Sequence, residues 1–111
     1  MNQSNELSGA LRQVLAGDHD SFGTFAVIGA EDCWVQYKPG EINAAYPFTD
    51  DPVQHLASFP DFEVLGWEAN NYVFGDLGRH DPGAIADWID RYFRETLQCP
   101  PSYELSIELE L

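Results

Sequence analysis

The chain has 111 residues, enough for one domain with a sizeable core that folds without disulfides, and its 44% hydrophobic share is ordinary for a globular protein. Nineteen acidic residues against five basic residues give a formal net charge of 5 − 19 = −14 at pH 7. A negative charge of this size opposes contact with phosphate backbones and anionic lipid, so we expect neither nucleic acid nor a membrane surface as a partner.

The start of the chain lacks the features of a targeting segment. Residues 1–6 have neither the basic start nor the apolar core of a signal peptide, and no apolar run approaches the roughly 20 residues that span a bilayer. Cys33 and Cys99 are the only cysteines, too few for a disulfide-stapled scaffold and too isolated for a paired zinc or redox motif. We therefore expect a cytoplasmic protein with both thiols reduced.

The first predicted element is a short amphipathic helix. Ser4 or Ser8 can cap its start, and Gly17 is placed to end it. Its apolar positions, spaced by three and four residues, are Leu7, Leu11, Val14 and Leu15. A polar turn follows at residues 18–21, where His19 lies between two aspartates. Adjacent side chains on an extended chain point in opposite directions and no third ligand is in view, so we expect a loop and not a metal site.

A three-stranded meander is predicted next, with strands at residues 24–29, 33–37 and 41–48. The turns between them are expected at residues 30–32 and 38–40, the second of which contains Pro and Gly. Large apolar side chains occupy both alternating positions of these strands. One face of the sheet must therefore be covered by helices.

A second helix start and a hairpin come after the meander. Asp51-Pro52 has the composition of a helix start, and residues 53–59 are long enough for a turn or two of helix, in which we expect His55 on the surface. Residues 61–67 and 71–77 are predicted to pair across a turn at residues 68–70, because Asn tolerates the left-handed conformation. Gly66 within the first of these strands indicates a bulge.

The clearest pattern belongs to the last third of the chain. Asp81-Pro82 predicts a helix start, and a helix with one apolar face is expected to end near Gln98, before two prolines. The apolar positions of this helix are Ile85, Trp88, Ile89, Tyr92, Phe93 and Leu97. A strand with one buried and one wet face should follow, because Tyr103, Leu105, Ile107, Leu109 and Leu111 alternate with Glu104, Ser106, Glu108 and Glu110.

These elements predict a single α+β domain over residues 1–111 in the order α-β-β-β-α-β-β-α-β. We expect a largely antiparallel twisted sheet of about five to six strands with helices packed on one face. The open edge of the last strand favours a homodimer.

Catalytic chemistry finds little support in the sequence. No glycine-rich phosphate loop follows a strand, and nothing brings Cys33 or Cys99 near a histidine that could act as a base. Adjacent carboxylates such as Asp50-Asp51 are common in so acidic a chain and therefore carry little weight. We expect a protein that is not an enzyme and that uses no cofactor or metal ion.

The candidate partner-binding residues are aromatic side chains on strands and glutamates on the last strand. Fifteen Phe, Trp and Tyr residues (7 + 3 + 5) exceed what a thin two-layer core readily hides, so some should emerge on the helix-free side of the sheet. A basic partner would relieve the repulsion between glutamates on one strand face. The candidates are Trp34, Tyr37, Tyr46, Trp67, Tyr72, Phe74, Glu104, Glu108 and Glu110.

Several short motifs between Phe22 and Leu111 are similar to those of a known family. They are Phe25-Ala26-Val27-Ile28, Trp34-Val35-Gln36-Tyr37, Leu65-Gly66-Trp67, Asp81-Pro82 with Ile85 and Ala86, and Thr96-Leu97 leading through Pro100-Pro101 to Glu104-Leu105. In these motifs and their order the chain resembles the TY-Chap group, small domains related to type III secretion chaperones and YbjN-like proteins. The resemblance implies an acidic, often dimeric domain of a helix-covered twisted sheet that binds segments of other proteins without catalysis.

Two functions follow as hypotheses. The first is a chaperone-like module that grips an extended or partly basic polypeptide, with an acidic surface for capture and aromatic side chains for affinity. The second is an immunity-type inhibitor that presents carboxylates to the phosphate-binding site of a basic toxin such as a nuclease. A neighbouring toxin gene would favour the second, and a secretion operon the first.

Overall fold

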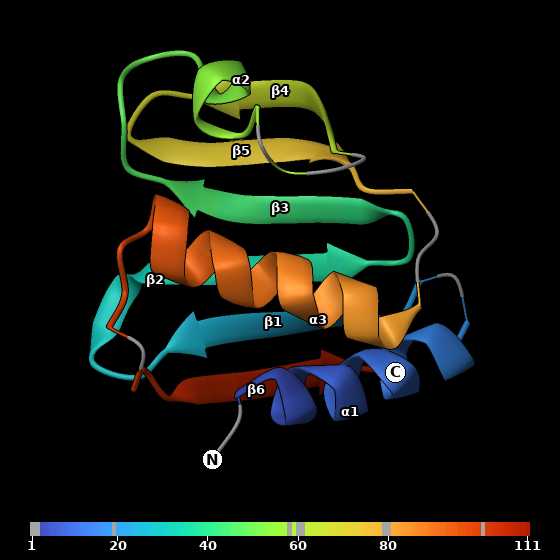
Figure 1. The fold of residues 1–111 in the computed structure, drawn as a ribbon. Helices are drawn as coiled ribbons and strands as arrows, with labels where there is room; N and C mark the ends of the chain where they lie inside the picture. Colours follow the sequence, from blue (N-terminus) through green and yellow to red (C-terminus); the bar gives the residue numbers. More distant parts are fainter. Residues whose placement is uncertain (1–2, 19, 58, 60–61, 79–80, 101) are drawn as a thin grey trace.

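The computed structural model describes residues 3–18, 20–57, 59, 62–78, 81–100 and 102–111. Its elements are α1 (Gln3–Ala16), β1 (Phe22–Val27), β2 (Ala30–Lys38), β3 (Glu41–Tyr46), α2 (Pro52–His55), β4 (Glu63–Glu68), β5 (Asn71–Asp76), α3 (Pro82–Arg91), the π-helical turn η1 (Tyr92–Thr96) and β6 (Leu105–Glu110). The strands of this described part form one six-stranded antiparallel sheet in the order β4-β5-β3-β2-β1-β6 (Figure 1). The predicted α+β class and element order are confirmed.

Helices cover one face of the sheet. Figure 1 shows α3 lying across β2 and β1, α1 beside it over β6, and the short α2 at the β4 end. The core lies between these helices and the sheet, where Phe25, Val35, Ile42 and Val73 meet Leu11, Ile85, Ile89 and Phe93. The opposite face of the sheet carries none of the described helices.

The prediction that Ser4 or Ser8 caps the first helix was wrong, because α1 begins at Gln3 and both serines lie within it. The starts of α2 and α3 follow the capping chemistry that the sequence predicts. Asp51 accepts a hydrogen bond from the Val53 N–H at 2.9 Å, and Asp81 accepts one from the Ala84 N–H at 2.8 Å. Proline occupies the first helical position in both cases, where no N–H is needed. The prediction for the length of α2 was too long, because this helix ends at His55.

The last helix ends in a wider turn than the sequence predicts. After Arg91 the chain continues as η1, in which the Leu97 N–H donates to the Tyr92 carbonyl at 3.0 Å, five residues back. The wide turn keeps Tyr92, Phe93 and Thr96 all buried against the sheet. Gln98 then takes a positive φ of 58°, and the helical segment stops where predicted.

The turns between strands are set by residues that adopt positive φ. The turn at residues 30–32 was predicted wrongly: β2 already begins at Ala30, and the turn is formed by Ile28 and Gly29, whose φ is 85°. The turn before β5 is one residue shorter than predicted, because Glu68 still belongs to β4, and Asn70 takes the expected positive φ, of 58°. A bulge near Gly66 is confirmed, because Val64 pairs with Gly75 and Gly66 with Phe74, which leaves Leu65 unpaired.

The last strand is an edge strand that pairs with β1. Leu105, Ile107 and Leu109 are half-buried on its inner side, as the alternation predicts. Leu111 does not belong to the buried face, since it lies beyond the strand and is 63% exposed. In the described part of the chain, no helix combines the length and the apolar character that crossing a bilayer requires.

Candidate functional site

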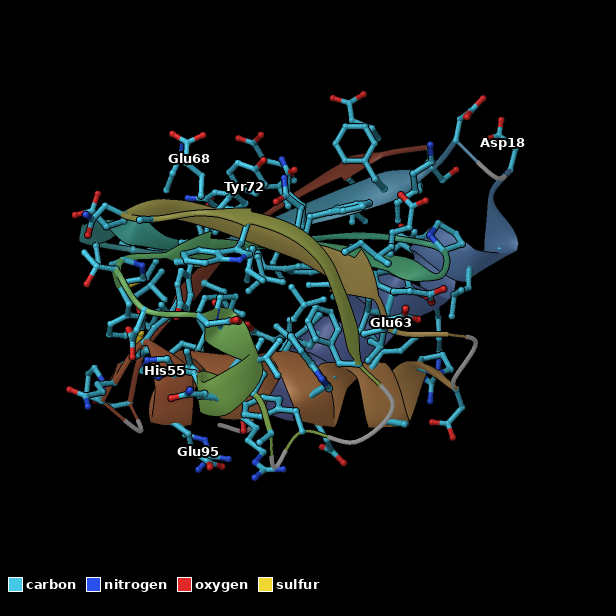
Figure 2. The ribbon with its side chains drawn as sticks, turned by 90° about the horizontal axis from the view of Figure 1, so that it is seen from above. Asp18, His55, Glu63, Glu68, Tyr72 and Glu95 are labelled. Atoms are coloured by element: carbon cyan, nitrogen blue, oxygen red, sulfur yellow. The ribbon has the colours of Figure 1, made fainter. Side chains whose placement is uncertain are left out.

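The helix-free face of the sheet gathers side chains from all six described strands. Thr24, Gln36, Asn43 and Phe74 lie in one cross-strand row, and Ala45 and Tyr72 are paired in the next. Figure 2 shows Tyr72 and Glu68 pointing away from the helices. The surface formed by Phe22, Trp34, Gln36, Asn43, Tyr72 and Phe74, all half-buried, is termed here the aromatic face.

The first hollow of the aromatic face combines aromatic walls with amide groups. It has a volume of about 310 Å³ and is lined by Phe22, Gln36, Tyr37, Lys38, Glu41, Asn43 and Phe74. The Gln36 amide donates to the Thr24 hydroxyl at 3.2 Å, whereas the buried Oδ1 of Asn43 accepts no hydrogen bond from the residues that the structure describes. Amides between phenyl rings suit a ligand that has both apolar groups and hydrogen-bonding groups, such as a peptide.

The second hollow lies at the other end of the same face. It has a volume of about 290 Å³ and is lined by Asp32, Trp34, Ala45, Tyr46, Pro47, Asn70 and Asn71. Asn43 and Ala45, which line the first and second hollows respectively, are two residues apart on β3. Positions two residues apart on a strand lie about 7 Å apart on the same face. The two hollows therefore follow one another along β3 on the same face of the sheet.

Carboxylates surround the aromatic face. Glu41 and Asp76 are paired across β3 and β5, Glu68 is paired with Tyr72, and Glu108 and Glu110 are paired with Thr24 and Phe22. Lys38 is the single lysine of the chain, and its Nζ lies 3.7 Å from a carboxylate oxygen of Asp20. The margin of this face is accordingly negative.

Two arginines lie on the helix layer instead. Arg91 pairs with Glu95 at 2.7 Å and Arg94 pairs with Asp90 at 2.9 Å, each four residues apart along the helical segment. The contact with Asp90 raises the pKa of the Arg94 guanidinium. Arg91 and Arg94 thus partly neutralise the carboxylates of the helix layer, at Glu95 and Asp90.

The structure separates the predicted aromatic residues into two groups. Trp34, Tyr72 and Phe74 lie on the aromatic face, but Tyr37 and Tyr46 have their rings in the core and are 1% and 0% exposed. The Tyr46 hydroxyl donates to the Asp50 carbonyl, and burial together with Asp50 and Asp51 raises its pKa to about 12. Neither tyrosine offers its ring to a partner, because their positions on β2 and β3 point toward the helices.

Trp67 lies apart from the aromatic face. It is paired with Val73, on the helix side of the sheet, at the outer strand β4. Its ring meets that of Tyr46 edge-on at a centroid distance of 6.0 Å, and 38% of the side chain is exposed. Trp67 therefore belongs to a different surface from Trp34.

The predicted glutamates lie at one margin of the site. Glu108 and Glu110 project from β6 on the side of the aromatic face, and Glu104 is exposed in the connection before this strand. The backbone carbonyl of Glu104 accepts a hydrogen bond from the Ile28 N–H at 2.8 Å. Phe22, Gln36 and Asn43 were not predicted as site residues from the sequence. The strand alternation could have indicated Gln36, which lies two residues from Trp34 on β2. Phe22 and Asn43 pair with the predicted residues Glu110 and Phe74.

His55 forms a small polar cluster away from the aromatic face. Its Nε2 lies 3.0 Å from Asp50 Oδ2, and its ring stacks on Phe48 at 4.7 Å. The hydrogen bond from His55 is the main reason that the pKa of Asp50 is lowered. The ring of His55 also meets the Tyr46 ring edge-on at 5.8 Å, and no cysteine, serine or threonine is among these contacts with described residues. His19 and His80 lie outside the described residues. Over the described ranges, no group of three or more His, Cys, Asp and Glu side chains could hold a metal ion.

The fold defines an α+β domain whose antiparallel sheet is covered by helices on one face and bears an aromatic, acid-rimmed surface on the other. Comparison with known proteins finds no matching family model, no significantly similar curated protein and no significantly similar solved structure.

Proposed function

We propose that this chain is a non-catalytic protein- or peptide-binding module whose aromatic face takes an extended, basic polypeptide. The observation that carries the proposal is the combination of half-buried aromatic rings with a carboxylate margin on the helix-free face. Membership of the TY-Chap group and a cytoplasmic location, with two free thiols, are part of the same proposal.

The aromatic side chains supply the apolar part of binding. Phe22, Trp34, Tyr72 and Phe74 are rigid and already ordered by their strands, so covering them orders few new rotamers. Truncation of one well-covered aromatic residue typically weakens binding by more than about 1 kcal/mol. Micromolar affinity requires about 8 kcal/mol in total, so amide hydrogen bonds and ion pairs must contribute in addition to the aromatic side chains.

The arrangement of the two hollows favours an extended partner. Because the hollows follow one another along β3, a peptide that runs along this strand would pass over both. Its outward positions are then free to carry lysine or arginine toward Glu68, Glu108 and Glu110 at the margin. Carboxylates at a rim mainly increase the association rate and select the sign of the partner's charge.

Trp34, which is half-buried, and Trp67, which is exposed, provide a matched test. Immobilised wild-type protein, Trp34→Ala and Trp67→Ala are each used to capture proteins from a lysate of the native cell, at low and at high salt. We expect wild type and Trp67→Ala to retain a common salt-sensitive partner, which Trp34→Ala binds roughly tenfold more weakly. The proposal is wrong if Trp34→Ala, shown to be folded by circular dichroism, keeps every partner, or if only Trp67→Ala loses one.

An immunity-type inhibitor of a basic toxin is the second candidate. The net charge of −14 and the exposed Glu108 and Glu110 on an edge strand favour it, because such carboxylates can occupy a phosphate-binding site. Co-expression with the toxin encoded by a neighbouring gene, if there is one, separates the two functions. Protection lost in Glu108→Gln/Glu110→Gln but kept in Trp34→Ala supports inhibition, and absence of protection eliminates it.

A further inference from the structure

Two cysteines far apart in the sequence meet at one end of the fold. Cys33 lies near the start of β2, and Cys99 follows the π-helical turn η1. Figure 1 shows that the chain leaves the end of the α3 segment above the beginning of β2 and then descends past it to β6. Cys99 is part of the hydrophobic core and Cys33 packs against that core, close enough to Cys99 to influence the pKa of its thiol.

The backbone around Cys99 holds this residue against the sheet. Its N–H donates to the Phe93 carbonyl at 2.8 Å, and the Phe93 ring packs on Tyr103 at 5.3 Å. On the far side of Cys99, the Glu104 carbonyl is bonded to the Ile28 N–H of the β1–β2 turn. The segment is therefore anchored on both sides of the cysteine, independently of any bond between the sulfurs.

The two thiols differ in accessibility. Cys33 is partly exposed, whereas Cys99 is 8% exposed. Burial, and then the hydrogen bond with Cys33, raises the pKa of the Cys99 thiol to about 12. A reagent from solvent therefore reaches Cys33 first, while Cys99 stays behind it as a protonated neighbour.

We propose that Cys33 and Cys99 form an oxidisable thiol pair that closes to an intramolecular disulfide between the start of β2 and the segment after η1. The oxidant is a small-molecule disulfide such as oxidised glutathione. The Cys33 thiolate attacks one sulfur of the oxidant, which forms a mixed disulfide and releases one glutathione thiolate. Cys99 then gives up its proton to solvent and attacks the Cys33 sulfur, which releases the second glutathione. Two protein thiols are oxidised and one glutathione disulfide is reduced to two thiols.

The disulfide joins the helix layer to the sheet across 66 positions of sequence (99 − 33). Closure of a long loop restricts the unfolded chain, so the oxidised protein should resist denaturant better than the reduced protein. This inference does not depend on the proposed function. It does connect with the aromatic face, since Trp34 directly follows Cys33 and lies on the opposite face of β2.

The test uses folded wild type, Cys33→Ser and Cys99→Ala, each incubated with oxidised glutathione and then analysed by thiol titration and intact mass. We expect wild type to lose both thiols, to lose two hydrogen atoms in mass and to remain a single chain. Peptide mapping should recover the Cys33 and Cys99 peptides as one linked species. The denaturation midpoint should rise in wild type and return to its starting value with a reducing agent.

The single variants distinguish the order of the two steps. Cys99→Ala should stop at a mixed disulfide with one glutathione on Cys33, and Cys33→Ser should keep its buried thiol unmodified. The proposal is overturned if folded wild type retains both thiols, carries two glutathiones or links two chains together. If a variant does not fold, the linked peptide from wild type alone decides the question.

Discussion

The hydroxyl of Tyr92 connects the helix layer with the middle of the sheet. The Tyr92 ring is fully buried, and its hydroxyl donates to the Ala45 carbonyl of β3 at 2.6 Å. Burial, with a smaller contribution from Tyr46, raises the pKa of Tyr92 far above its usual range. Burial therefore favours the neutral form of the Tyr92 hydroxyl in the folded state, so ionisation of Tyr92 opposes folding.

Tyr92→Phe should lower the free energy of unfolding by about 1 kcal/mol at pH 7, because one buried hydrogen bond is lost. As the pH rises above about 10, tyrosine ionises in the unfolded chain first, so the contribution of Tyr92 to stability is progressively lost. The difference between wild type and Tyr92→Phe should therefore narrow at alkaline pH. Urea unfolding at a series of pH values measures this.

Tyr72→Phe is the matched control, because it removes a hydroxyl from a half-buried ring on the aromatic face. We expect a smaller effect at pH 7 than in Tyr92→Phe. Equal losses in the two variants, or a difference between wild type and Tyr92→Phe that grows with pH, would contradict the role assigned to the Tyr92 hydroxyl.

At the scale of elements, the start of α3 depends on one carboxylate. Asp81→Ala removes the acceptor for the Ala84 N–H, and we expect the free energy of unfolding to fall by about 1 kcal/mol. Asp87→Ala is the control, since this exposed residue lies within the same helix and does not cap it. Chemical denaturation should show a lower free energy of unfolding in Asp81→Ala and not in Asp87→Ala. Equal denaturation midpoints in the two variants would contradict the capping role of Asp81.

The outer face of β6 is expected to influence the rate at which a basic partner associates. Glu108→Gln/Glu110→Gln removes two carboxylates from the margin of the aromatic face, and should slow association with a basic partner severalfold at low salt. At high salt the variant and wild type should bind at similar rates, because screening removes long-range attraction. Stopped-flow fluorescence gives the rates.

Asp87→Asn is the control for the glutamate variant, since it removes an exposed carboxylate from the helix layer. Its association rate should resemble that of wild type. If the association rate of Asp87→Asn fell as much as that of the double variant, net charge alone, and not the position of the carboxylates, would determine the rate.

Most elements can be predicted because their signals are local. The Asp-Pro helix starts, the alternation of β6 and the bulge near Gly66 each depend on a few neighbouring residues. The β1–β2 turn was misplaced because Ala30-Glu31-Asp32 looked more polar than Ile28-Gly29, although Gly29 supplies the positive φ. The π-helical ending of α3 arises from packing of Tyr92 and Phe93 on the sheet, which no local pattern reveals.

The site was predictable only in part, because the sequence does not say which face of each strand is covered. Trp34 and Tyr37 are both aromatic residues of β2, yet their alternation puts one on the aromatic face and the other in the core. The thiol pair was not predictable either. Cys33 and Cys99 come together through the position of the whole α3 segment over β2.

At the scale of the whole molecule, we propose a homodimer formed through the open outer edge of β6. Two copies carry 2 × (−14) = −28, so repulsion opposes association and added salt should favour it. Light scattering at high micromolar concentration should give twice the 12.5 kDa mass, with a dimer fraction that rises with salt. A strict monomer at every salt concentration would refute the dimer.

The most direct test of binding at the aromatic face uses the three tryptophans, which lie in three different places. Trp34 is on the aromatic face, Trp67 is at the outer strand β4, and Trp88 is on the buried side of α3. Each indole N–H gives its own signal in a two-dimensional nitrogen–proton NMR spectrum. The probe is a short synthetic peptide in which lysine alternates with leucine, and its control replaces lysine with glutamate.

Titration with the lysine peptide should move the Trp34 indole signal and the backbone signals of β2, β3 and β5 around it, and leave those of Trp67 and Trp88 in place. The glutamate peptide should move none of them. Displacement of the Trp67 signal with an unchanged Trp34 signal, or no displacement by the lysine peptide at any concentration, would contradict binding at the aromatic face.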